Sequence, residues 1–144
     1  MKPSSFFSYR AGVLFLLLFS LVFAGCGSSA SSPEAVVQKY FRAIADNNVD
    51  AVLSCFPLKT VDQKNMPAVR AWAQAGLAAQ HAGFKAMGGL KSVKTTIAKQ
   101  EGNTAFASAL ITTGNGQTFE QQVILVNEDG WKISIGPVAE MLGL

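Results

Sequence analysis

Hydrophobic and polar residues follow three patterns along the chain. Residues 11–25 form a nearly continuous apolar run behind Lys2 and Arg10. Between residues 33 and 80 apolar side chains recur every three or four residues, which is typical of amphipathic helices, and from residue 90 onward they alternate with polar ones, which is typical of strands. The sequence therefore predicts an N-terminal segment followed by helices and then by a sheet.

Three helices are expected in the first half. The first begins at the signal Ser31–Glu34, where Ser31 or Ser32 supplies the cap and a proline stands in the first turn. It ends near Asp46–Asn48. A second, short helix begins after Asn48 and stops at Pro57, because the residue before a proline disfavours helical geometry. The third runs from about Pro67 to Gln80.

Four strands are expected in the second half, at Leu90–Gln100, Thr104–Thr113, Gln117–Asn127 and Trp131–Gly136. Short turns rich in Gly, Asn and Asp separate them, so neighbouring strands are antiparallel. The expected inward set is Phe106, Leu110, Phe119, Val123, Leu125, Trp131, Ile133 and Ile135. Helices followed by strands predict a single α+β domain over residues 33–144, in which N-terminal helices pack on a four-stranded antiparallel sheet. Its roughly 112 residues suffice for one core.

The N-terminal 25 residues are typical of a secretory signal peptide, with a charged start, an apolar stretch and small residues at the end. The apolar stretch is about 15 residues long, and a membrane-spanning helix needs roughly 20, so a permanent transmembrane helix is the weaker interpretation. The sequence Phe23-Ala24-Gly25-Cys26 resembles the lipobox of bacterial lipoproteins, although that motif usually has Leu where this chain has Phe23. The alternative is an ordinary cleaved signal that leaves Cys26 as a plain thiol.

The lipobox resemblance implies removal of residues 1–25 and acylation of Cys26, which makes the lipid bilayer a partner of the mature chain. Attachment through more than one acyl chain is stable. Residues 27–32 form a Gly/Ser-rich tether with a reach of roughly 13 Å, which holds the domain near the bilayer. Inner-membrane retention is typically signalled by Asp at the position of Gly27. The expected location is therefore the bacterial cell envelope, on the periplasmic side, at the outer membrane where the host has two membranes.

Charge argues against nucleic acid as a partner. The chain has a formal charge of +3, but Lys2 and Arg10 precede Cys26, which leaves ten Lys and Arg against nine Asp and Glu, or +1. Nucleic-acid binders normally carry a clustered basic stripe, whereas these cations are spread along the chain.

Three stretches of the domain resemble the nuclear transport factor 2-like superfamily, a group with a cystatin-like cone, and within it small bacterial lipoproteins that carry a domain of unknown function. They are Tyr40-Phe41 with Ala43 in the first helix, the Asp46–Asp50 link into the second helix, and the closing strand at Glu128–Ile133. The resemblance implies a curved sheet wrapped around helices, sometimes with a pocket and often with dimers formed through the sheet. This fold hosts enzymes and binding modules alike, so it does not fix the function.

No catalytic, metal-binding or cofactor-binding set is predicted. Most carboxylates fall at helix starts and turns, and the single His81 lies beyond the third predicted helix, where a solvated side chain is expected. Metal sites need three or four converging ligands, and Cys55 is expected to be a buried apolar residue. Gly88-Gly89 lacks the Lys and Ser/Thr that follow the glycines of a phosphate loop.

Four polar or amphipathic side chains are candidates to line an interior pocket: Tyr40, Trp72, Thr95 and Gln121. They are either hydrogen-bonded residues of the core and sheet or groups that orient a ligand in an apolar pocket. The favoured function is a membrane-anchored, non-catalytic binding or interaction module, whose partner is an envelope protein or a small apolar ligand. Two alternatives remain: a cone-type enzyme, such as an isomerase or dehydratase acting on an apolar substrate, and a purely structural homodimer.

Overall fold

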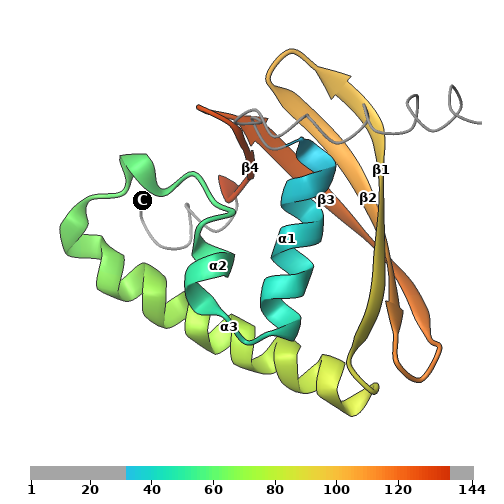
Figure 1. Cartoon of the computed structure of the whole chain (residues 1–144). Helices are drawn as coiled ribbons and strands as arrows, with labels where there is room; N and C mark the ends of the chain where they lie inside the picture. The colour runs from blue at the N-terminus through green and yellow to red at the C-terminus, as the bar shows by residue number, and fades with distance from the viewer. Residues whose placement is uncertain (1–31, 137–144) are drawn as a thin grey trace, which may run out of the picture.

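The computed structural model describes residues 32–136, in which helices precede a four-stranded sheet (Figure 1). The predicted α+β class is confirmed. The elements are α1 (Pro33–Ala45), α2 (Val49–Leu53), the 3-10 turns η1 (Leu58–Thr60) and η2 (Gln63–Asn65), α3 (Met66–Ala86), β1 (Leu90–Glu101), β2 (Thr104–Thr113), β3 (Thr118–Asn127) and β4 (Trp131–Ile133). The predicted signal peptide, Cys26 and most of the tether lie outside the described residues, as do residues 137–144.

Side-chain caps fix where the first two helices begin. The Ser32 hydroxyl accepts a hydrogen bond from the Ala35 amide at 3.2 Å, and Pro33 follows in the first turn. Of the two caps that the sequence allowed, Ser32 is therefore the one in use. The Asn48 side chain caps α2 in the same way, at 3.0 Å from the Ala51 amide. Such caps satisfy amides that have no partner inside the helix.

The third helix is longer than predicted, because it continues past Gln80 to Ala86. Gly83 does not end it, and the extension brings Phe84 into the core. The helix stops before Gly88 and Gly89, whose φ angles of 82° and 85° favour glycine. Among residues 32–136, none of the helices combines the length and apolar character needed to cross a membrane.

The strands form an antiparallel meander in the order β1-β2-β3-β4. The predicted fourth strand was too long, because β4 ends at Ile133. The next residue still contacts the sheet, since the Ser134 amide donates a hydrogen bond to the Ile124 carbonyl at 2.8 Å. Beside it, the Ile133 amide donates to the Cys55 carbonyl at 2.7 Å, so the chain after α2 covers part of the edge of β4. An edge that is covered in this way offers fewer groups for pairing with another chain.

One face of the sheet, here called the inner face, packs against α1 (Figure 1). α1 contributes Val37, Phe41 and Ile44 to the core, and all three are at most 1% exposed. Beneath the helices, β2 presents Ala105, Ala107 and Ala109, each with no exposed surface, and then Ile111. The central strand therefore buries mostly methyl groups where it meets the helical layer.

The predicted inward set was wrong on β2. Phe106 and Leu110 lie on the opposite, outer face and are 37% and 42% exposed. Strand register explains this, because Ala105 and Ala107 pair with Leu125 and Val123, and directly paired residues share a face. Four other members of the predicted set are buried as expected: Val123, Leu125, Trp131 and Ile133. Phe119 lies on the inner face but is 37% exposed. Ile135 is half-buried and lies beyond the end of β4.

Candidate functional site

Two of the predicted pocket residues, Tyr40 and Trp72, line one narrow crevice between α1, α2 and α3. Its volume is about 60 Å³. The full lining is Tyr40, Ile44, Val52, Phe56, Trp72, Ala73, Gly76, Leu77 and Gln80. A drug-sized ligand occupies several hundred Å³, so in this conformation the crevice holds at most a single aliphatic group.

Contacts between aromatic rings hold the Tyr40 side chain in place in the wall of this crevice. The Tyr40 ring meets those of Phe41 and Phe56 edge to face, with ring centres 5.2 and 5.8 Å apart. Burial raises the pKa of the Tyr40 hydroxyl above its ordinary value of 10.0, and a hydrogen bond to the Gln80 side chain opposes that rise. Trp72, by contrast, is 39% exposed. The crevice thus has a rigid aromatic wall and an indole that reaches solvent.

The other two predicted pocket residues lie on the sheet and are not part of this crevice. Thr95 of β1, Ala109 of β2 and Gln121 of β3 form one cross-strand row on the inner face. The Thr95 hydroxyl is buried and has no hydrogen-bond partner among the described residues. Gln121 is exposed, because the helices leave that part of β3 uncovered. The structure therefore separates the four candidates into two pairs.

Two larger depressions border β4, and the sequence analysis did not anticipate either. The first, which we call the loop groove, has a volume of about 480 Å³ and is lined by Pro57, Thr60, Val61, Asp62, Asn65, Val126, Glu128, Ser134, Ile135 and Gly136. The second, the basic groove, measures about 510 Å³ and is lined by Asp50, Leu53, Ser54, Phe56, Pro57, Leu58, Lys59, Met66, Arg70, Glu128 and Lys132. They adjoin, since Pro57 and Glu128 line both. Their sizes fall in the range of ligand sites.

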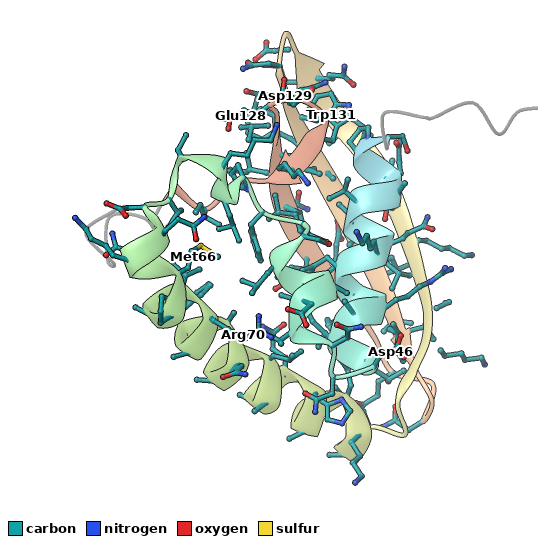
Figure 2. The ribbon with its side chains drawn as sticks, turned by 60° about the vertical axis from the view of Figure 1, so that its left-hand side comes forward. Asp46, Met66, Arg70, Glu128, Asp129 and Trp131 are labelled. Atoms are coloured by element: carbon teal, nitrogen blue, oxygen red, sulfur yellow. The ribbon has the colours of Figure 1, made fainter. Side chains whose placement is uncertain are left out.

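The basic groove is assembled from elements distant in sequence. Figure 2 shows Met66 and Arg70 on the first half of α3, and Glu128 and Asp129 at the turn before β4. The stretch Glu128–Ile133 carries part of the superfamily resemblance, but nothing in the local sequence indicates that it meets the first half of α3. The apolar part of the groove comes from Leu53, Phe56, Leu58 and Met66, and its cations are Lys59, Arg70 and Lys132.

Each of those cations has an oxygen partner. Arg70 Nη1 lies 2.8 Å from Asp50 Oδ1, and Lys59 Nζ lies 2.6 Å from Asp129 Oδ2. Hydrogen bonding and charge from the two cations hold the pKa values of the Asp50 and Asp129 carboxyls below their ordinary value of 3.8. Lys132 Nζ instead donates to the Ser54 carbonyl, at 2.7 Å. Exposed pairs of this kind contribute little to stability, so they position charge and do not hold the fold together.

The groups with catalytic potential each have a structural partner. His81 lies inside α3 and not beyond it as predicted, and its Nδ1 is 3.2 Å from the Ile44 carbonyl at the end of α1. Cys55 is 2% exposed, its thiol donates to the Ala51 carbonyl at 3.4 Å, and burial raises its pKa.

The strand carboxylate Glu120 lies on the outer face, in the row of Leu110, where it accepts hydrogen bonds from Ser108 and Gln122. Across residues 32–136, no three His, Cys, Asp or Glu side chains come together as metal ligands. Cys55, His81 and Glu120 thus lie at three separate places in the described part of the chain.

Comparison with known proteins identifies the architecture. Neither the protein-family models nor the curated proteins contain a match. Among solved structures, the chain is similar to a Campylobacter jejuni protein described as a "putative NTF2-like transpeptidase", with a TM-score of 0.65 over 72% of this chain and 97% of that one. This chain has a nuclear transport factor 2-like fold. At 20% identity the likeness concerns the NTF2-like fold alone.

The NTF2-like fold that the sequence resemblance implied is confirmed, whereas the lipoprotein part of that resemblance stays a prediction. In this NTF2-like domain, α1 occupies the inner face of the sheet and the crevice beside it is narrow. Two open spaces that are much larger than this crevice lie at the edge of the sheet, around β4.

Proposed function

We propose that the protein is an envelope lipoprotein, anchored through acylated Cys26, whose NTF2-like domain is a non-catalytic binding module. One observation supports the non-catalytic part most strongly. Cys55, His81 and Glu120 lie on three separate segments, and each is engaged with a structural partner. Activation of a nucleophile such as a thiol needs a base within hydrogen-bond reach of it, and a general acid or base must lie within reach of the substrate.

The position of α1 is compatible with the anchor. Pro33 begins this helix seven residues after Cys26, and a tether of six small, polar residues has a reach of roughly 13 Å. The anchored domain would therefore be oriented with the N-terminal end of α1 nearest the bilayer. Ligands or partners in the envelope would meet the grooves around β4, which have an apolar wall and fixed charges at the rim.

Cell fractionation tests the anchor. We expect the full chain to sediment with membranes and to be released by detergent, and we expect Cys26→Ser to move it to the soluble fraction or leave it as unprocessed precursor. Cys55→Ser is the matched control, because it removes the other cysteine and leaves the lipobox intact. Equal distribution of the Cys26→Ser variant and the wild-type chain would overturn the anchored assignment.

The outer face of the sheet supports a second candidate function, a structural homodimer. Phe106, Leu110 and Ile124 are 37%, 42% and 48% exposed on this face. Lys94, Leu110 and Glu120 form one cross-strand row across it. Two copies related by a twofold axis parallel to β2 would bring each Lys94 over the Glu120 of the other copy, so the face is self-complementary in charge.

Sedimentation of the full chain in detergent distinguishes the two functions. The dimer hypothesis expects a wild-type dimer and a monomer for Leu110→Asp, because the introduced carboxylates of the two copies would face each other at the centre of the interface and lie beside Glu120. Gln74→Asp, on the exposed side of α3, is the control and should leave the mass unchanged. A wild-type monomer at high concentration would eliminate the structural dimer.

A further inference from the structure

We propose that the sheet edge formed by β1 binds an extended segment of a partner protein, which adds to the sheet as a further strand and carries acidic residues opposite the lysines of β1. The inference goes beyond the proposed function, because β1 lies at the opposite edge of the sheet from β4 and its grooves.

The two edges of the sheet differ in how they are covered. β4 has only three residues, and the Ile133 amide in this strand donates to the Cys55 carbonyl. β1, at the opposite edge, has twelve residues (Figure 1). Within residues 32–136, no backbone hydrogen bond joins β1 to a segment other than β2. In this part of the chain, the backbone groups of β1 that point away from β2 are therefore open to a further strand.

The middle of β1 has the regular geometry that strand addition needs. The register between β1 and β2 shifts between Leu90 and Ser92 and again between Ile97 and Lys99, but it is continuous from Ser92 to Ile97. Irregularities of this kind at an edge normally limit pairing with other chains. Here they leave the six residues 92–97 in regular pairing, which is the length of a typical strand.

The side chains of β1 indicate what the added strand must present. Val93 and Ile97 lie on the inner face, where they pack against the core but remain half-buried. An apolar side chain on the same face of the partner strand would cover more of their surface, which is favourable. Lys94 lies on the outer face, in the row of Leu110. The partner segment is therefore expected to alternate apolar residues on the inner side with charged residues on the outer side.

Charge favours an acidic segment over a second copy of this chain. β1 carries Lys91, Lys94 and Lys99 against Glu101, and β2 beside it has no charged residue. Among the described residues, Lys99 alone of these lysines has an ion pair, to Glu101 at 2.7 Å. The carboxylate in the row of Lys94 is that of Glu120, two strands away. Two β1 strands placed edge to edge would bring like charges together, which is destabilising, whereas carboxylates on an added strand would pair with the lysines.

Binding of a short peptide to the full chain in detergent tests the edge. The probe is a heptapeptide of alternating Glu and Val with blocked ends, and the control peptide has the same composition with its valines adjacent. We expect the alternating peptide to bind more tightly and to slow the hydrogen exchange of every second backbone amide between Ser92 and Ile97, because only amides that point away from β2 gain a partner.

Four results of this experiment would overturn the proposal. They are an absence of binding, equal binding of the two peptides, binding that leaves the exchange of the β1 amides unchanged, and slow exchange of all these amides in the free protein. The last result would mean that the edge is already occupied. NMR measures exchange at each amide, and the readout does not depend on the anchor or on the grooves.

Methylation of the peptide backbone separates strand pairing from attraction between charges. An N-methyl group removes a donor, and alternate amides of a strand point to opposite edges. We would compare the alternating peptide N-methylated at every Glu with the same peptide N-methylated at every Val. One of the two should lose binding and the other should retain it. Equal affinity of the two methylated peptides would contradict pairing through the backbone.

A charge reversal tests the role of the lysines. Lys94→Glu/Lys99→Glu should weaken binding of the Glu/Val peptide roughly tenfold, because attractive cross-strand pairs become repulsive. The same variant should instead bind a peptide of alternating Lys and Val. Lys39→Glu/Lys85→Glu is the matched control, since it changes the net charge equally and both lysines are exposed on helices. Equal losses in the two double variants would contradict the pairing of an acidic segment with the lysines of β1.

Discussion

The two faces of β2 differ in side-chain size: the buried inner face carries mostly alanines, and the exposed outer face carries larger residues. The inner face carries Ala105, Ala107 and Ala109 with no exposed surface, whereas the outer face carries Phe106 and Leu110, which remain 37% and 42% exposed. The difference shows that distance to the covering layer, and not side-chain size alone, decides which residues form the core of this sheet. Because α1 crosses close to the inner face of β2, the alanine methyl groups fill the space between helix and strand, and larger side chains would not fit there.

The largest contrast is expected between neighbouring residues on opposite faces of β3. Leu125→Ala should destabilise the fold by roughly 3 kcal/mol, because Leu125 is completely buried and its truncation leaves a cavity. Ile124→Ala should cost well under about 1 kcal/mol, since Ile124 is 48% exposed. Chemical denaturation of both variants measures the difference. Equal losses would mean that the outer face is also covered.

A smaller but still clear effect is expected from overfilling the inner face. Ala107→Leu should cost about 1–3 kcal/mol, because its extra methylene and methyl groups have no space beneath the helical layer. Ala98→Leu is the control, as Ala98 is exposed where the register between β1 and β2 shifts. If thermal unfolding gives the same midpoint for both variants, the close approach of α1 to β2 is wrong.

Two threonines of the inner face test whether polar groups there are satisfied. The Thr113 hydroxyl is hydrogen-bonded to Asn115 Oδ1 at 2.7 Å and to the Gln117 carbonyl at 3.1 Å, so Thr113→Val should destabilise by about 1 kcal/mol. The Thr95 hydroxyl has no such partner among the described residues, and Thr95→Val should be neutral or slightly stabilising. Denaturation midpoints in the opposite order would imply that the Thr95 hydroxyl has a role, such as contact with a ligand.

The smallest effect concerns alkaline pH. Burial raises the pKa values of Cys55 and Tyr40 above their ordinary values of 9.0 and 10.0. The unfolded chain therefore loses these protons at lower pH than the folded one, so their contribution to stability is complete below about pH 9 and declines as the pH rises further. Denaturation curves between pH 7 and 10.5 should show this decline, and Cys55→Ala should reduce it. A pH-independent free energy of unfolding would contradict the burial of both groups.

The sequence predicted the order of helices and strands because periodicity and turn residues act locally. Ser32, Asn48 and Pro57 mark helix boundaries through neighbouring backbone groups, and these boundaries were confirmed to within a few residues. The inward assignment of Phe106 and Leu110 failed, because alternation gives two faces to a strand but does not say which face is covered. Pairing with Val123 and Leu125 decides that question, and pairing is a property of the whole sheet.

The candidate site was less predictable than the fold for the same reason. Tyr40 and Trp72 stand out in the sequence as amphipathic aromatics, and they do line one crevice. The larger grooves depend on the meeting of η1, α3 and the turn before β4, and no local pattern indicates that these three segments come together. Only the folded chain brings Lys132 to the Ser54 carbonyl, 78 residues away.

The most direct test of the proposed role is the mass of the N-terminal peptide of the protein isolated from the membranes of its native host. The proposal predicts that this peptide begins at Cys26 and carries the added mass of a diacylglyceryl group, with a further acyl chain where the host N-acylates its lipoproteins. A peptide with an unmodified Cys26 thiol, or an intact segment 1–25 in the mature protein, would contradict it.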